Sequence, residues 1–250
     1  MLTVDFDLLP IKKDERILDI GCGSGRHTWH VNKVEQCTVY AADYDVESLQ
    51  KAKYVLDLMD RQNESKGKWG LLQGNATKLP FKDQVFDKII CSEVLEHIMD
   101  DDSGVKELYR VLKNDGKLAV SVPCYFPENL YWRISEDYHT NPGGHIRIYR
   151  RNELIKLLTR NNLCIYAVRH KHAFHSIYWL LRCLCDVRNE NAWIPKAYHK
   201  FLAWDISTKH WFFRGLENLL DHLFPKSVVI YLDKETGKGK PGSACLTPSP

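Results

Sequence analysis

Short apolar runs alternate with amphipathic segments along most of this chain. Apolar runs bounded by turn residues are typical of buried parallel strands, whereas apolar positions three or four residues apart are typical of helices. By these criteria the sequence predicts strands at 17–20, 38–42, 71–73, 86–91, 117–122, 164–169 and 228–232, and helices at 26–34, 46–64, 105–113 and 152–160. Such an alternation of strands and helices indicates an α/β fold with a mostly parallel sheet of seven strands and helices on both faces.

Two segments interrupt this alternation. Residues 124–149 are aromatic, contain glycine and proline and show no period, so we expect an irregular segment with a hinge at Gly143 and Gly144 that folds over a site as a lid. Roughly 55 residues separate the last two strands, far more than a hairpin loop. This stretch carries helical patterns at 173–188, 196–207 and 210–223, with Pro195 where the first turn of a helix tolerates proline.

The domain organisation follows from these patterns. A length of 250 residues with 44% hydrophobic composition is sufficient for one large core. We expect a core at 1–169 that includes the lid-like segment 124–149, an aromatic-rich helical insertion at 170–226 and a final core strand at 227–233. The polar tail at 234–250, rich in glycine and proline, is predicted to be disordered.

Charge and cysteine usage limit the partners and the compartment. A formal net charge of +3 is too small to require a nucleic acid, so no nucleic-acid partner is expected. The eight cysteines show no CxxC pair and are interpreted as reduced thiols of a cytoplasmic protein. No apolar stretch approaches the roughly 18 residues of a spanning helix. The protein is therefore expected in the cytoplasm, with peripheral membrane contact as an open alternative.

A glycine-rich loop directly follows the first predicted strand. Gly21, Gly23 and Gly25 occupy every second position, which lets the backbone approach a ligand closely. Arg26 stands where a dinucleotide-binding loop would place its third glycine, which argues against a pyrophosphate site. Asp43 ends the second strand about 20 residues further on, where a carboxylate accepts hydrogen bonds from ribose hydroxyls. Together they predict a nucleoside site.

Five segments in order resemble the motifs of class I S-adenosylmethionine (SAM)-dependent methyltransferases. ILDIGCGSGRHT resembles the first motif, AADYD the second, GNATKLPF the third and FDKIICSEVLEHI the fourth, while VLKNDGKLAVSVP resembles the fifth-strand segment. The resemblance covers residues 14–123 and is much more specific than any single motif. It implies a Rossmann-like fold and SAM as the cofactor.

The resemblance also implies roles for individual residues. The cofactor-binding residues would be Asp19, Gly21, Gly23, Gly25, Asp43, Tyr44, Asn75, Ala76, Ser92 and Glu93. The glycines and Asp19 would hold the methionine end of the cofactor, and Asp43 its ribose. Tyr44 would pack beside the adenine, and Asn75 and Ala76 would bind its edge. Ser92 and Glu93 would line the side where the methyl group lies.

Histidines are the candidate catalytic residues. An oxygen, nitrogen or activated carbon acceptor can require a general base that titrates near neutral pH, and histidine fits that requirement. His97 follows the fourth strand, and His139 and His145 lie in the lid-like segment, so these three are the candidates. His170, His172 and His175 lack nearby carboxylates and are interpreted as a solvated basic turn, so no metal site is expected.

The helical insertion is unusually aromatic, since it carries Trp179, Trp193, Trp204 and Trp211. These rings are expected to pack among the helices, and they also suit the roof of an apolar pocket or a surface resting on a membrane. The sequence therefore predicts a SAM-dependent methyltransferase acting on a small, hydrophobic or lipid-like organic acceptor, at oxygen or carbon rather than nitrogen. An RNA or protein methyltransferase and a catalytically silent SAM-binding module are the alternatives; the oligomeric state is left open.

Overall fold

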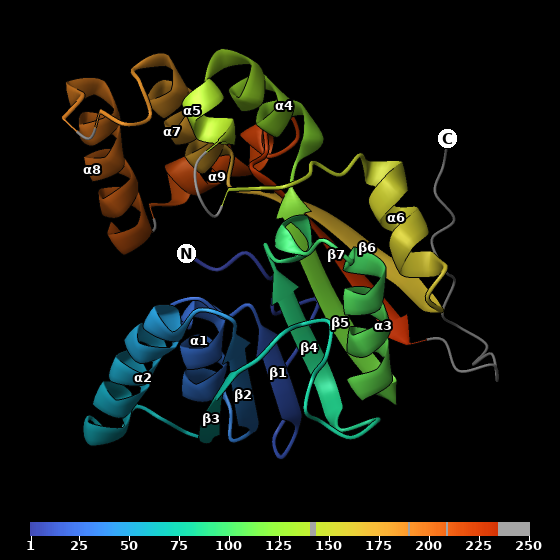
Figure 1. The fold of residues 1–250 in the computed structure, drawn as a ribbon. Helices are drawn as coiled ribbons and strands as arrows, with labels where there is room; N and C mark the ends of the chain where they lie inside the picture. Colours follow the sequence, from blue (N-terminus) through green and yellow to red (C-terminus); the bar gives the residue numbers. More distant parts are fainter. Residues whose placement is uncertain (141–143, 190, 209, 235–250) are drawn as a thin grey trace.

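The computed structural model describes residues 1–140, 144–189, 191–208 and 210–234, and these form a sheet flanked by helices (Figure 1). The sheet has seven strands in the order β3-β2-β1-β4-β5-β7-β6. Strands β1 to β5 run parallel, and β7 runs antiparallel to both β5 and β6. Their bounds are β1 Arg16–Ile20, β2 Thr38–Asp43, β3 Lys68–Gln73, β4 Phe86–Ser92, β5 Leu112–Pro123, β6 Leu163–Lys171 and β7 Ser227–Lys234. The predicted α/β, Rossmann-like fold is confirmed.

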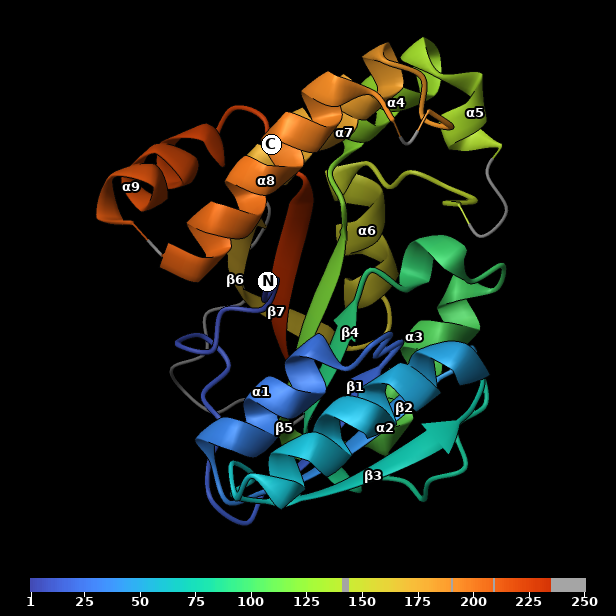
Figure 2. The ribbon, with the colours of Figure 1, turned by 90° about the vertical axis from the view of Figure 1, so that its left-hand side faces the viewer.

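Four helices cover the sheet: α1 (Arg26–Val34), α2 (Val46–Arg61), α3 (Asp101–Val111) and α6 (Arg151–Thr159). Figure 2 shows α1 and α2 on one face, with α3 and α6 behind the sheet. The sequence explains why α2 begins where it does, because the Asp45 side chain accepts hydrogen bonds from the backbone N–H groups of Glu47 and Ser48. Its buried residues Leu49, Ala52, Leu56 and Met59 recur at helical spacing.

Consecutive residues of the central strands are buried on opposite faces of the sheet. Ile17 packs in a cluster with Val31 of α1, whereas the next residue, Leu18, packs in a cluster with Leu108 of α3 and Leu154 of α6. Burial on both faces accounts for the uninterrupted apolar runs of these strands. The result is a rigid sheet that fixes the positions of its carboxyl ends.

A helical cap lies beyond the carboxyl ends of β4 and β5 (Figure 1). It consists of α4 (Tyr125–Ile134), α5 (Glu136–His139), α7 (Ala173–Leu184), α8 (Trp193–Thr208) and α9 (Trp211–Leu220). Helices α4 and α7 come from different segments, and the hydroxyl of the fully buried Tyr131 joins them by donating a hydrogen bond of 2.7 Å to the carbonyl of Ser176. The three predicted insertion helices are present as α7, α8 and α9, and Pro195 lies in the first turn of α8.

Several local predictions were wrong. Much of the segment 124–149 is helical, in α4 and α5. Pro127 does not prevent this, because it lies in the first turn of α4, where the backbone N–H of a residue has no partner within the helix. Strand β5 begins at Leu112, five residues earlier than predicted, beside a shift in the β4–β5 register. Helix α3 begins four residues earlier than predicted, since the Asp100 side chain caps its first turn by accepting a hydrogen bond from the backbone N–H of Ser103. Lys234, the first residue of the predicted tail 234–250, belongs to β7, while Gly143 and the remaining tail residues 235–250 lie outside the described residues.

The cysteines of the described residues differ from the expectation at one position. Six cysteines in the described part of the chain are free thiols, but Cys164 is disulfide-bonded, so the expectation of eight reduced thiols was wrong at that position. None of the helices in the described residues combines the length and apolar composition needed to cross a bilayer.

Candidate functional site

A cleft of about 830 Å³ lies at the carboxyl ends of β1, β2 and β4. Strands β1 and β4 are neighbours, but the chain leaves β1 towards β2 on one side and returns to β4 on the other. Such a switch in strand order is where open α/β sheets bind ligands. The cleft is lined by Ile20, Gly21, Gly23, Asp43, Tyr44, Asp45, Ser48, Gly74, Asn75, Ala76, Thr77, Glu93, Val94, His97, Ile98, Met99 and Asp100.

The loop after β1 turns sharply at its glycines. Gly21 has a φ of +65° and lies so close to Val94 that a Cβ atom would come within 2.2 Å of that side chain. Gly23 also has a positive φ, of +53°, but nothing lies within 4 Å of the place where its Cβ would be. Gly23 thus presents bare backbone to the cleft, and a side chain there would enter the ligand space.

Asp43 ties this loop to the end of β2. One oxygen of its carboxylate accepts a hydrogen bond of 2.7 Å from the N–H of Gly23, and the other accepts one of 2.9 Å from the N–H of Asp45. Each carboxylate oxygen has more than one acceptor site, so capacity remains for ligand hydroxyls. Asp43 therefore both shapes the loop and presents negative charge to the cleft.

Asp19 lies at the base of the loop and is almost completely buried, with 1% of its surface exposed. One carboxylate oxygen accepts a hydrogen bond of 2.6 Å from the Thr28 hydroxyl, while the other is buried without a partner among the described residues. Burial raises the pKa of Asp19 to about 6, and the hydrogen bond from Thr28 only partly opposes this. An unpaired buried carboxylate oxygen is costly, so this atom suits a cationic ligand group.

The other predicted cofactor residues divide into two groups. Tyr44, Asn75, Ala76 and Glu93 line the cleft. Glu93 has a left-handed φ of +58°, a strained conformation that is concentrated at functional sites.

Besides Asp19, two predicted cofactor residues lie outside the cleft lining. Ser92 is buried, with its hydroxyl 2.9 Å from that of Ser121. Gly25 lies against α2, and a Cβ there would come within 3.0 Å of Ala52. Both residues therefore pack behind the surface that a ligand would touch.

The three candidate histidines are not equivalent. His97 lines the cleft, and its Nδ1 lies 3.2 Å from the carbonyl oxygen of Gly144. The ring of His145 lies beside that of His97, with 5.1 Å between the ring centroids. His139 is exposed and stacks on Trp132 in the cap, at a centroid distance of 4.0 Å. The structure thus brings His97 and His145 together and leaves His139 apart.

Glu128 of α4 holds His145 in place. Its buried carboxylate lies 2.5 Å from Nδ1 of His145 and accepts a hydrogen bond of 2.9 Å from Lys226 Nζ. Burial alone would raise the pKa of Glu128, but the hydrogen bond from His145 and the charge of Lys226 outweigh it and lower that pKa to about 2. Neither Glu128 nor Lys226 was singled out from the sequence, since nothing local in the sequence connects them with His145.

Glu96 was also missed. It belongs to the short 3-10 helix η1 (Leu95–His97), is fully buried, and has neither carboxylate oxygen hydrogen-bonded within the described part of the chain. Burial, together with the negative charge of Glu93, raises the pKa of Glu96 well above its usual range. The sequence predicts that His170, His172 and His175 form a solvated turn. This prediction was wrong for His172, which is buried beside Thr3.

Comparison with known proteins identifies the family. The family model described as "Methyltransferase domain" matches residues 11–179. The ubiquinone/menaquinone biosynthesis C-methyltransferase UbiE of Haemophilus ducreyi is 31% identical over 144 residues, which are 55% of this chain and 54% of that protein. The sterol 24-C-methyltransferase ERG6 of Saccharomyces cerevisiae is 25% identical over 144 residues, 58% of this chain and 34% of that protein.

Solved structures agree in fold. A SAM-dependent methyltransferase from Methanosarcina mazei superposes with a TM-score of 0.60 at 18% identity, covering 94% of this chain and 99% of that one. The chain spans about half the length, or less, of the first curated relatives that it matches. It belongs to the methyltransferase-domain family. Its fold is the class I, Rossmann-like fold of SAM-dependent methyltransferases.

The residues of the cleft fit the SAM cofactor of this family. Its methionine end carries an ammonium group, which matches in charge the unpaired oxygen of Asp19, a buried residue that is not part of the cleft lining. Its ribose offers two hydroxyls, which match the carboxylate of Asp43 at the cleft. The bare backbone at Gly23 leaves the space that such a molecule needs.

The raised pKa of Asp19 predicts a pH dependence of cofactor binding. With an apo-protein pKa of about 6, Asp19 is ionised above that pH and accepts from the ligand ammonium, whereas below it the carboxyl is protonated. Affinity for S-adenosylhomocysteine, measured by calorimetry between pH 5 and 8, should then fall by up to about tenfold per pH unit below 6. Asp19→Asn should bind weakly at every pH. An unchanged slope in that variant would contradict the assignment.

Proposed function

We propose that this protein transfers the methyl group of SAM to a small, apolar organic acceptor, at carbon or oxygen. The observation that carries the proposal is the cleft at the switch in strand order, which Gly23 and Asp43 line. The unpaired, buried oxygen of Asp19, at the end of β1, supports it. When bound, SAM supplies a methyl group on a positively charged sulfur. The chain's main task is therefore to align the acceptor and to exclude water, not to form a covalent intermediate.

In this proposal, separate groups of residues bind the separate parts of SAM. Asp43 accepts from the ribose hydroxyls, Asp19 from the ammonium group, and the backbone of Gly21 and Gly23 lies along the methionine end. Tyr44 is 77% exposed at the rim and stacks on the adenine, whose edge contacts Asn75 and Ala76. Glu93 marks the methyl side, and Ser92 supports it through Ser121, whose hydroxyl donates to the Glu93 carboxylate at 2.9 Å.

The acceptor enters from the side of the cap. His97 and His145 lie on this side, and we propose that they act on the proton that the acceptor loses, whereas His139 has no part in catalysis. Aromatic side chains fill the cap; Tyr131, Tyr138 and Trp179, for example, pack edge to face at 5.4 to 5.5 Å. The relatives are named for action on quinones and sterols, which supports an apolar acceptor.

Methyl transfer from labelled SAM tests the proposal. The protein is incubated with the label and, separately, with prenylated hydroquinones, sterols, RNA and a protein extract. Label should enter an organic-extractable product with one of the apolar acceptors, and Asp43→Ala should abolish the transfer. Label in the RNA or protein fraction would contradict the acceptor class, and no transfer to any acceptor would favour a silent binding module.

The outer surface of the cap supports contact with a lipid bilayer. Trp193, Trp211, Phe212, Leu219 and Leu223 are all more than half exposed on or beside α8 and α9. The exposed Lys196, Lys200 and Arg214 belong to the same helices. Exposed tryptophan and aliphatic side chains beside basic groups are typical of surfaces that rest on anionic membranes. We propose that the protein takes its acceptor from such a surface.

A vesicle assay measures this contact. Trp211→Ser should reduce co-sedimentation with anionic phospholipid vesicles by about tenfold, since burying one large apolar side chain contributes roughly 1.5 to 3 kcal/mol. Tyr54→Ser is the matched control, because Tyr54 is 71% exposed on α2, away from the cap. Equal sedimentation of both variants and the unmodified protein would refute the membrane surface.

A further inference from the structure

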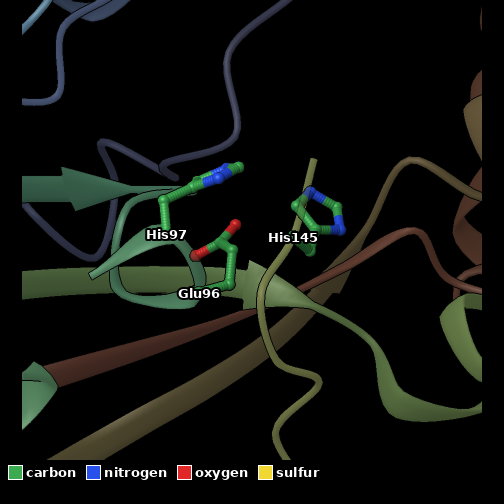
Figure 3. A group of neighbouring side chains, drawn as sticks. All are labelled: Glu96, His97 and His145. Atoms are coloured by element: carbon green, nitrogen blue, oxygen red, sulfur yellow. The ribbon is translucent and has the colours of Figure 1, made fainter. Parts of the chain in front are cut away.

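Two histidines and a glutamate converge at the wall of the cofactor cleft. Glu96, His97 and His145 each offer a ligand atom, and these atoms lie within 4.8 Å of one another. Figure 3 shows the Glu96 carboxylate between the two imidazole rings. His97 also lines the cleft, so the group is in contact with the space that ligands enter.

The Glu96 carboxylate has an unusual environment. The side chain is fully buried, and both of its oxygens lack a hydrogen-bond partner among the described residues. An unpaired buried carboxylate costs several kcal/mol, so such groups are normally paired or coordinate metals. The side chains of the two histidines are the neighbours that would complete a coordination shell.

Both imidazoles are held in the orientation that metal ligands require. Nδ1 of His97 lies 3.2 Å from the Gly144 carbonyl oxygen, and Nδ1 of His145 lies 2.5 Å from the Glu128 carboxylate. Each ring therefore donates its Nδ1–H to an acceptor, and Nε2 of each ring is left with its lone pair. Metal-binding histidines almost always donate their other N–H to a carboxylate or a carbonyl group.

We propose that Glu96, His97 and His145 bind a divalent transition-metal cation at the wall of the cleft. Two imidazole nitrogens and one carboxylate suit Mn²⁺, Fe²⁺, Co²⁺ or Zn²⁺, whereas Mg²⁺ and Ca²⁺ prefer oxygen ligands. Three protein ligands leave coordination positions open, as in catalytic rather than structural metal sites. Glu128 is a positioning residue, because it acts through His145.

This inference rests on the proposed function and specifies the acceptor as one that reacts through oxygen. An acceptor hydroxyl bound to the cation loses its proton to solvent more readily, because the cation stabilises the oxyanion. The oxyanion then forms an O–CH₃ bond while the S–CH₃ bond breaks, and the electron pair of that bond stays on sulfur. His97 and His145 would thus act on the acceptor proton through the cation that they hold.

Metal binding is measured directly. The whole protein is treated with EDTA, dialysed and titrated with Mn²⁺, and free Mn²⁺ is followed by electron paramagnetic resonance; Co²⁺ absorption reports the ligand set. One ion should bind per chain. His97→Gln, His145→Gln and Glu96→Gln should each weaken binding by at least about 100-fold, and Glu128→Gln by about 10- to 100-fold.

The control is His139→Gln, which removes a histidine of the cap that lies outside the group and should leave Mn²⁺ affinity unchanged. Thermal unfolding in EDTA shows whether each variant folds, and His97→Gln serves if the buried Glu96→Gln does not. Absence of Mn²⁺ binding, or binding that survives all three ligand substitutions, would overturn the inference. S-adenosylhomocysteine binding in EDTA is independent of it, so its loss would instead overturn the proposed function.

Discussion

Replacing Asp43 with alanine will weaken binding of S-adenosylhomocysteine by about 100-fold or more. Hydrogen bonds to a charged group contribute about 1.5 to 3 kcal/mol each, and the proposed site has two of them to the ribose. The substitution also removes the acceptor of the 2.7 Å hydrogen bond from Gly23 N, which holds the loop against β2. Isothermal titration calorimetry at pH 7.5 measures the effect.

Asp45→Ala is the matched control for this loss. Asp45 lies two residues further along the same edge, and its side chain caps the first turn of α2. Its removal should cost about 1 kcal/mol of unfolding free energy and should change affinity much less than the Asp43 substitution. Since Asp45 also lines the cleft but does not bond the glycine loop, equal affinity losses in both variants would mean that negative charge at this edge, not ribose binding by Asp43, explains the effect.

Replacing Glu128 with alanine will lower the free energy of unfolding by about 3 to 5 kcal/mol, the usual cost of leaving a buried charge without its partner. Lys226 has only 12% of its side chain exposed and donates to Glu128 at 2.9 Å. The Tyr138 hydroxyl also donates to this carboxylate, at 3.2 Å. Urea unfolding in EDTA measures the loss without any contribution from bound metal.

Two further variants separate the cost of a buried, unpaired charge from the cost of losing a partly exposed ion pair. Glu128→Ala combined with Lys226→Met should recover much of the lost stability, because no charge is then left buried and unpaired. Asp233→Ala breaks the pair with Lys117, which is about one-third exposed, and should cost about 1 kcal/mol or less. A loss for Glu128→Ala no larger than that for Asp233→Ala would show that the buried charge is stabilised by other groups.

Most residues of the proposed cofactor side could be predicted to lie at the cleft, because they follow strand ends in short, local motifs. Gly21, Gly23, Asp43 and Asn75 all line the cleft as expected, since parallel strands bring their carboxyl ends to one edge of the sheet. These motifs did not indicate, however, which residues reach the surface of the cleft and which pack behind it. The Ser92 hydroxyl contacts that of Ser121, and Gly25 packs against Ala52.

The acceptor side could not be predicted in this way. Glu128 lies 17 residues before His145 and 98 residues before Lys226, and only tertiary packing brings the three together. Likewise, the sequence suggested a lid where the structure has α4 and α5, because aromatic residues and Pro127 obscured the helical period. The three proposed metal ligands were not grouped from the sequence, since they come from two segments, and the expectation of no metal considered a different set of histidines.

The cap is made by two separate stretches of chain, one between β5 and α6 and one between β6 and β7, that are joined through Tyr131 and Ser176. Neither stretch contributes a strand to the sheet below them. In a chimera that borrows substrate preference from another family member, grafting one stretch alone would leave Tyr131 or Ser176 facing a foreign surface. The two insertions must be exchanged as a pair, and they should also diversify as a pair among natural homologues.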